Sequence, residues 1–181
     1  PELKPFYSNR IVHNWIQAGI VYWMNIQKSD GSFDETYPNE HSFCASAFST
    51  CAIAQVLRLL DLKIPGLVDS LTSAGDWLDR HQDAGPTNQT IAAALALNEI
   101  FRITGDKKYS QASQRKLDQA MVNWMSEGYF LEYGGFDLGY TTIVLSHLAL
   151  LYLDTGYEWI KDISLKAIDK VSHTMDEKFQ W

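Results

Sequence analysis

Hydrophobic residues recur every three to four positions along most of the chain, in runs of about 14 to 20 residues separated by short polar stretches. Runs of this length and period are typical of helices and are too long for most strands. Glycine-containing turns, such as Asp30-Gly31 and Gly134-Gly135, separate them. The pattern therefore predicts an all-α fold of about seven helices, at residues 10–28, 42–60, 67–82, 88–103, 109–128, 140–153 and 159–179.

The composition of these helices alternates along the chain. The helices at 42–60, 88–103 and 140–153 are rich in small or apolar residues, whereas the others carry more charge. A turn with glycine precedes each apolar helix, about every 50 residues. A helical hairpin that repeats in this way stacks on its neighbours, because a single hairpin leaves its apolar face exposed. We therefore expect the apolar helices to form an inner layer and the charged helices an outer layer, which also carries Trp15, Trp23, Trp77, Trp124 and Trp159.

The turns share finer detail, in which an aromatic residue on the helix is followed by glutamine, glycine and a second aromatic residue. The first turn has this series complete, as Tyr22, Gln27, Gly31 and Phe33. The second has Trp77, Gln82 and Gly85, and the third has Trp124, Gly135 and Phe136 without the glutamine. This series resembles the QW repeat of squalene cyclases and related terpenoid cyclases. The resemblance implies that Gln27 and Gln82 hydrogen-bond the backbone at the start of the following inner helix.

The same resemblance implies an α/α toroid, an architecture shared with protein prenyltransferases, polysaccharide lyases and toroidal glycoside hydrolases. The chain supplies about three and a half hairpins, fewer than a closed toroid of these families contains. We therefore interpret residues 1–181 as a single α/α-toroid domain that is part of a larger barrel. The barrel would be completed by its remaining hairpins or by a homo-oligomer.

In such an array, every turn that leads from an outer to an inner helix lies at the same end. Three polar segments, which contain residues 34–41, 83–90 and 131–140, should therefore meet at one rim around a central cavity. Some of their polar residues are expected to cap the inner helices: Asn39 or Ser42 for the first, Thr87 or Asn88 for the second, and Asp137 for the third. Capping explains at most one residue of the run 37–41, so a functional site is predicted there.

The rim residues suit carbohydrate chemistry. Paired carboxylates can cleave a glycosidic bond, and Glu40 is the predicted general acid. Toroidal polysaccharide lyases instead use asparagine with histidine or tyrosine, which implies Asn39, His41 and Tyr140 as alternative catalytic residues. The predicted substrate-binding residues are Asp34, Glu35, Tyr37, Asn88, Phe136 and Asp137. Because this rim is acidic and has no lysine or arginine in these segments, it favours a neutral or amino-bearing glycan over a uronate.

Charge and cysteine content exclude several other classes. The net charge of −7 disfavours nucleic-acid binding, and no apolar run is long enough for a membrane span. Cys44 and Cys51 would lie about 10 Å apart on one helix, beyond disulfide reach and without the spacing of zinc ligands. We predict no metal site and no cofactor. The alternatives to a carbohydrate-active toroid are a non-catalytic helical module and isoprenoid chemistry, although the Asp-x-Asp-Asp run of the cyclases is missing.

Overall fold

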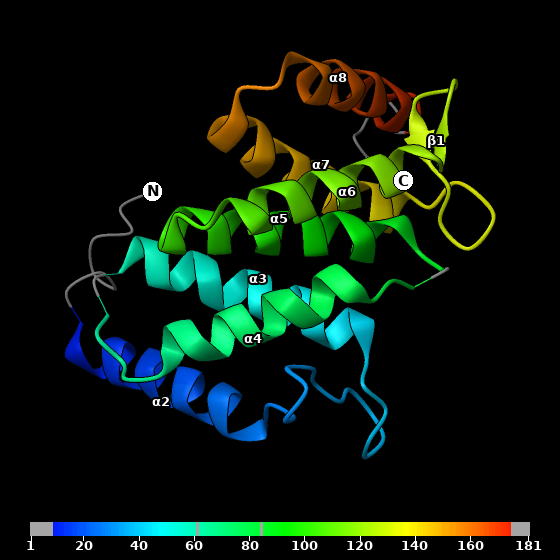
Figure 1. Cartoon of the computed structure of the whole chain (residues 1–181). Coiled ribbons are helices and arrows are strands. Elements are labelled where there is room, and N and C mark those ends of the chain that lie inside the picture. Colours follow the sequence, from blue (N-terminus) through cyan, green and yellow to red (C-terminus); the bar gives the residue numbers. More distant parts are fainter. Residues whose placement is uncertain (1–8, 61, 84, 175–181) are drawn as a thin grey trace.

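The chain is described by a computed structural model that covers residues 9–60, 62–83 and 85–174 (Figure 1). These residues form an all-α fold, as predicted, with only a minor two-stranded sheet. The helices are α2 (Arg10–Ile26), α3 (Phe43–Leu59), α4 (Leu67–Arg80), α5 (Thr87–Thr104), α6 (Lys107–Met121), α7 (Leu138–Thr155) and α8 (Glu158–Ser172). The predicted end of the last helix, residues 175–179, lies outside the described residues.

The prediction of a helix over 109–128 is wrong in its second half. The α6 helix ends at Met121, and the chain then forms β1 (Trp124–Met125) and β2 (Tyr129–Phe130), which pair antiparallel. The turn between them needs Gly128, whose φ is +88° and whose missing Cβ would lie 2.8 Å from the carbonyl oxygen of Lys166. Trp124 therefore sits on a strand, with its ring 4.9 Å from that of Phe130, rather than on an outer helix.

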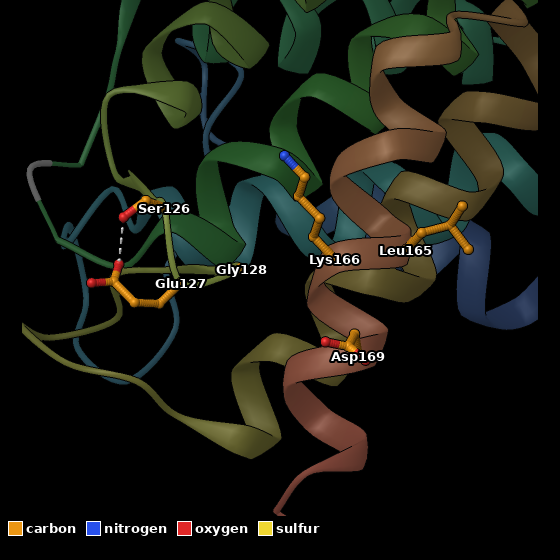
Figure 2. A pocket seen from close by; sticks show the side chains of 6 residues that line it. All are labelled: Ser126, Glu127, Gly128, Leu165, Lys166 and Asp169. Carbon is orange, nitrogen blue, oxygen red and sulfur yellow. Dashed lines mark hydrogen bonds between the residues drawn. The ribbon is translucent and has the colours of Figure 1, made fainter.

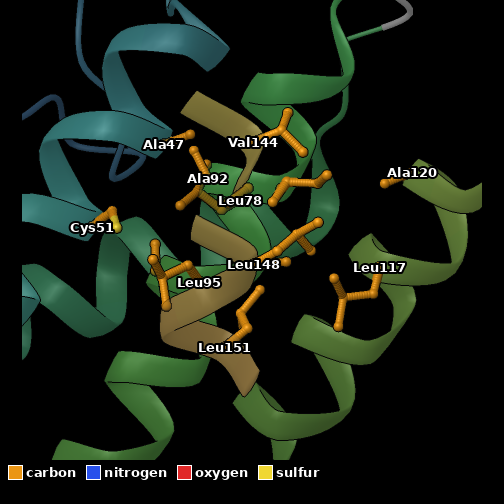
Figure 3. Close-up of a cluster of buried hydrophobic side chains, with 14 of the residues drawn as sticks. Ala47, Cys51, Leu78, Ala92, Leu95, Leu117, Ala120, Val144, Leu148 and Leu151 are labelled. Atoms are coloured by element: carbon orange, nitrogen blue, oxygen red, sulfur yellow. The ribbon is translucent and has the colours of Figure 1, made fainter. Parts of the chain in front are cut away.

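The α5 helix lies at the centre of the molecule. Every residue from Thr87 to Ile100 is buried, because α3, α4, α6 and α7 all pack around this helix. Its alanines, among them Ala92, allow the neighbouring helices to approach closely (Figure 3). The α3 and α7 helices also meet each other, since Phe48 contacts His147 with 5.6 Å between ring centroids. The α3 and α7 helices therefore touch at this ring pair.

The buried core joins all of these helices. Figure 3 shows Cys51 of α3, Leu95 of α5, Leu117 of α6 and Leu148 of α7 within one cluster. Cys51 and Cys44 are free thiols, as predicted, and Cys51 packs as a small apolar residue. No helix among the described residues is both long enough and apolar enough to cross a membrane.

Each outer helix docks on the turn of the hairpin before it. The Gln27 amide donates to the carbonyl oxygens of Gly31, at 3.1 Å, and of Ser70 in α4, at 2.9 Å. The prediction that Gln27 bonds the inner helix is therefore wrong, because its partner in the next hairpin is an outer helix. In the second hairpin the ammonium of Lys116 in α6 takes this role and donates to the carbonyl oxygen of His81 at 2.5 Å. Gln82 is exposed, and no hydrogen bond joins its side chain to the described residues.

The three turns that lead into α3, α5 and α7 lie at the same end of the molecule (Figure 1). The connections that follow these helices lie at the other end. This arrangement brings together the polar segments that the sequence predicted to be neighbours.

Candidate functional site at the rim

We call the turns before α3, α5 and α7 the rim, which comprises residues 27–42, 81–83, 85–88 and 131–140. Hydrogen bonds join two of these segments. Glu132 of the third segment accepts them from the backbone and side chain of Asn88 in the second, at 2.7 and 2.9 Å. The first segment lies at the same end of the molecule (Figure 1). At the start of α3, burial raises the pKa of the Cys44 thiol, and the carboxylates of Glu35 and Asp83 raise it further.

Asp34 organises the first segment. Its carboxylate lies 2.6 Å from the ammonium of Lys28 and accepts hydrogen bonds from the backbone N–H groups of Asn39 and His41. The hydrogen bond from Lys28, aided by these amides, holds the pKa of Asp34 well below its usual range. Asn39 and His41 themselves have φ values of +63° and +50°, a conformation that asparagine and histidine tolerate better than most residues.

The carboxylate of Glu40 closes a second tight turn in the same segment. One oxygen accepts hydrogen bonds from the backbone N–H groups of Glu35, Thr36 and Tyr37, at 2.8 to 3.2 Å. The bonds from Thr36, Tyr37 and Glu35 lower the pKa of Glu40, so its charged form is favoured. A general acid needs a raised pKa, and this geometry therefore favours a structural role for Glu40 over the acid role predicted from the sequence.

His41 has the geometry of a positioned base. Its Nδ1 lies 2.9 Å from the carboxylate of Asp30 and 2.8 Å from the hydroxyl oxygen of Ser32. This is not a nucleophilic triad, because both groups contact the same ring nitrogen and Ser32 is fully buried. The other ring nitrogen, Nε2, has no partner among the described residues, and the side chain is 43% exposed. Asp30 therefore orients the ring and leaves Nε2 open to a ligand.

A hollow of about 350 Å³ opens beside this segment, between α2 and α3. Asp34, Glu35 and Cys44 line it, together with the aromatic residues Trp23, Phe33 and Phe48. The hydroxyl of Ser42 donates a hydrogen bond to the Glu35 carboxylate at 2.9 Å and so holds Glu35 at the edge of this hollow. The same hydroxyl accepts from the N–H of Ala45, so Ser42 caps α3 as predicted. Tyr37 is 70% exposed and stands outside this hollow.

The start of α5 is capped from another segment. The prediction of Thr87 or Asn88 as its cap is wrong, because Pro86 occupies that position and offers no side-chain hydrogen bond. Glu132 fills the gap by accepting the Asn88 N–H, and Asn88 is itself buried. Burial raises the pKa of Glu132, although the two bonds from Asn88 oppose this. The sequence does contain one sign of this arrangement. Pro86 stands at the N-cap position of α5 and has no side-chain acceptor, so a residue from elsewhere in the chain has to accept the N–H groups of the first turn.

The third segment presents two tyrosines. Glu132 and Gly135 exchange two backbone hydrogen bonds across a tight turn whose central residues, Tyr133 and Gly134, have φ of +51° and +87°. These angles are those of a type I′ turn. The Tyr133 ring is 71% exposed and lies 5.7 Å from the Tyr140 ring. Desolvation raises the pKa of the Tyr133 hydroxyl, and Tyr140, Cys44 and Glu132 raise it further.

Asp137 and Phe136, the two other predicted substrate-binding residues of this segment, are both engaged within the protein. Asp137 caps α7 as predicted, since it accepts from the N–H of Tyr140 at 2.8 Å. Phe136 lies against Tyr129, and the ammonium of Lys170 stands 5.5 Å from the centre of its ring. Its ring is therefore engaged by β2 and α8.

A further hollow, of about 460 Å³, lies between the β1–β2 turn and α8 (Figure 2). Ser126 bonds the neighbouring Glu127 (Figure 2), and no hydrogen bond or ion pair joins the ammonium of Lys166 to either residue. The polar groups of this hollow do not converge on one point, so we place no site there. Among the described residues, no group of three or more His, Cys, Asp or Glu side chains is arranged to hold a metal ion.

No protein-family model, no curated protein and no solved structure matches this chain. We therefore infer a function from the chemistry of the rim.

Proposed function

We propose that the rim binds a neutral or amino-bearing glycan, and that this chain is the glycan-recognition part of a carbohydrate-active α/α-toroid protein. The alternation of outer and inner helices and the gathering of their turns at one end support the toroid. The exposed tyrosines beside several carboxylates support the ligand class, since sugars stack on aromatic rings and donate hydroxyl hydrogen bonds to carboxylates.

The observation that carries the proposal is the placement of Tyr133. The first central position of a type I′ turn favours asparagine, aspartate or glycine, so a tyrosine there costs about 1 kcal/mol. The ring recovers little of this by burial, because it is 71% exposed. A side chain that strains its turn and contributes little to the core is well suited to contact a ligand.

The charge of the rim selects the glycan. Asp34, Glu35, Glu40, Asp83 and Asp137 lie on it, and the ammonium of Lys28 is already paired with Asp34. A uronate chain would meet this surface with like charge, whereas an amino sugar would be attracted to it.

Among the predicted catalytic residues, His41 is best placed for proton transfer. Asp30 fixes Nδ1, and Nε2 is open to a ligand. Tyr140, which faces Tyr133, can supply a second hydroxyl to the same ligand. We therefore assign recognition to the tyrosines and propose His41 as the proton-transfer residue of any reaction at this rim.

Calorimetric titration with tetramers of glucosamine, N-acetylglucosamine, glucose and galacturonate tests this function. The wild-type chain should bind a neutral or amino-bearing tetramer more tightly than galacturonate. The Tyr133→Asn variant should bind about fivefold more weakly, because it loses one stacking contact of about 1 kcal/mol. It should also melt at a higher temperature, because asparagine suits a type I′ turn.

The matched control is Tyr157→Ala, which removes a tyrosine that is 45% exposed at the other end of the molecule. Its binding should equal that of the wild type. Unchanged binding by Tyr133→Asn, despite a higher melting temperature, would place the site elsewhere. Absence of binding to every tetramer would reject the glycan function.

A non-catalytic helical module is the second candidate. It is favoured by Asp34 and Glu40, since both carboxylates are used to fold the first segment. The two candidates differ in one result: a module that binds a protein partner leaves all four tetramers unbound.

A further inference from the structure

Two hollows lie between α2 and α3, and they share part of their lining. The first is the hollow of about 350 Å³ at the rim, which has Glu35 at its edge. The second, which we call the apolar groove, has a volume of about 450 Å³ and extends away from the rim along both helices. Trp23 and Ile26 of α2 and Ser49 of α3 line both. The two hollows are therefore continuous.

The polarity of this continuous depression changes along its length. At the rim, Glu35 accepts a hydrogen bond from Ser42, and no ion pair joins its carboxylate to another described residue. The apolar groove has no charged side chain in its lining, and Ile16, Ile53 and Val56 form its far part. A mostly apolar pocket with a few polar groups at one end is typical of a site for a ligand with a polar and an apolar part.

Trp23 forms an apolar surface where the two hollows meet. Its side chain is buried, and its indole N–H donates to the hydroxyl of Ser49 at 2.9 Å. Its ring is stacked on Phe33, with 4.6 Å between ring centroids. Because the only polar atom of this side chain is already paired, Trp23 offers its ring to a ligand as an apolar contact. A hydrocarbon chain loses nothing there, whereas a sugar hydroxyl would give up its hydrogen bonds to water.

Gly19 lines the apolar groove and keeps it open. It lies inside α2, where glycine is less favourable than alanine. No neighbouring atom of the described residues lies within 4 Å of the position of its missing Cβ. Gly75 inside α4 differs, because a Cβ there would lie 2.8 Å from the side chain of Ile100. Packing within the described residues therefore accounts for Gly75 but not for Gly19, whereas a ligand lying against α2 would account for it.

We propose that the glycan of the rim carries a hydrocarbon chain, and that this chain lies in the apolar groove while the sugar stays at the rim. The ligand is then an amphiphile, with its sugar beside Glu35 and its chain along Trp23 and Gly19. Twelve residues of α3 separate Cys44 at the rim from Val56, so the track is about 18 Å long. This inference rests on the glycan function proposed above, because the chain is attached to the sugar that the rim binds.

Calorimetric titration with alkylated glycans tests the inference. The ligands are the glucosamine and N-acetylglucosamine tetramers, each free and with a butyl, hexyl or octyl chain at its reducing end, all below the concentration at which micelles form. Affinity should rise with the length of the chain, by about twofold to fourfold for each methylene that the groove removes from water.

A variant that fills the groove separates this site from other apolar surfaces. Gly19→Leu places a side chain where no atom now lies, and it should lose about tenfold or more of the gain from the octyl chain. Its affinity for the free tetramer should equal that of the wild type. The matched control is Ala18→Leu, which adds the same side chain one residue earlier, at an exposed position outside the lining of the groove. It should keep the whole gain.

Ala52→Leu on α3 is a second variant that fills the groove, and it should behave as Gly19→Leu does. Circular dichroism checks that all three variants are folded. A free tetramer that binds but gains nothing from the chain would overturn this inference and leave the glycan function standing, and the groove would then belong to another protein element. A gain that both filled variants keep would also overturn it, because the chain would lie elsewhere. Free tetramers that do not bind at all would reject the glycan function itself, and this inference with it.

Discussion

At the scale of single residues, the same side-chain type serves different purposes on the rim. Glu40 accepts three backbone hydrogen bonds in an exposed turn, which lower its pKa. Glu132 is buried at the start of α5, where burial raises its pKa. The sequence presents both as rim glutamates, and their contrast arises only from their surroundings. The hydrogen bonds of Glu40 therefore disfavour the acid role predicted for it, whereas Glu132 accepts the Asn88 N–H at the start of α5.

Lys116 is a second residue whose environment outweighs its type. It is 1% exposed, donates to the carbonyl oxygen of His81, and its ammonium lies 5.4 Å from the centre of the Phe43 ring. Burial lowers the pKa of Lys116 to about 8, from 10.5 for an ordinary lysine. The unfolded chain therefore keeps this proton to a higher pH than the folded chain, and folding releases it between these two values.

This linkage predicts how stability changes in alkaline solution. Lys116 should make the free energy of unfolding rise with pH between about 8 and 10.5, because the unfolded state binds more protons in that window. Urea unfolding of the wild type and of Lys116→Met at several pH values measures this as a difference between the two proteins. The same comparison with Lys107→Met, on the exposed start of α6, is the control. A Lys116→Met variant whose pH dependence matches the wild type would contradict the assignment.

At the scale of elements, the helices with a regular period were predictable and the exceptions have local causes. The ranges expected for the three inner helices differ from α3, α5 and α7 by at most two residues at either end. Their apolar faces repeat without interruption, and Ser42 and Asp137 cap α3 and α7 as expected. The β1–β2 hairpin was missed because two-residue strands leave almost no alternating pattern, and its need for Gly128 arises from the close approach of α8.

The contacts between hairpins were less predictable than the hairpins themselves. The resemblance to the QW repeat identified Gln27 as a residue that ties elements together, but not the outer helix that it bonds. It also gave Gln82 the same role, which Lys116 performs in the second hairpin. A repeat in sequence indicates where adjacent hairpins meet. Which hydrogen bonds form at that contact depends on the side chains that lie within reach of it.

This difference between the glutamines can be measured. Gln27→Ala should lower the free energy of unfolding by about 1–2 kcal/mol, because its amide donates two hydrogen bonds in a partly buried site. Gln82→Ala should change it by no more than about 0.5 kcal/mol, since that side chain is exposed. Urea denaturation of both variants provides the comparison, and equal losses would mean that the joint does not depend on Gln27.

A charged network joins the other ends of the inner helices. Arg58 of α3 contacts Glu99 of α5, with Nε 2.7 Å from Oε2, and Asp154 of α7, with Nη1 3.2 Å from Oδ1. Glu99 is fully buried, and burial raises its pKa while Arg58 lowers it. One arginine therefore holds three helices and also supplies the countercharge that a buried carboxylate needs.

Removal of this arginine should be costly. Arg58→Met should lower the free energy of unfolding by about 3–5 kcal/mol, because Glu99 loses its closest countercharge inside the core. Arg115→Met is the matched control, since it removes an ion pair with Asp79 that is exposed on both sides, and it should cost less than about 1 kcal/mol. A thermal melt of each variant distinguishes them. A small effect of Arg58→Met would show that Glu99 is neutral in the folded protein.

At the scale of the whole molecule, the two ends of the helical layers differ in how they are built. One end is held by the Arg58 network, whereas the rim at the other end is built from turns with strained backbone at Asn39, His41 and Tyr133. These are all of the described non-glycine residues with positive φ. Strain of this kind persists where the surrounding structure imposes it, and it often accompanies ligand contact. The sequence predicted that the three segments would lie at one end, but it gave no sign of the contact between Phe48 of α3 and His147 of α7.

The most direct test of the proposal that the rim binds a glycan is a nuclear magnetic resonance titration of the isotope-labelled chain with glucosamine and N-acetylglucosamine tetramers. We expect chemical-shift changes that saturate and that centre on the amides of Glu35, Cys44, Tyr133 and Tyr140. We expect no comparable changes at the Arg58 end of the helices, and weaker ones with a galacturonate tetramer. Unchanged spectra at millimolar glycan, or shifts confined to Ile16, Ala52 and Val56 in the apolar groove between α2 and α3, would contradict it.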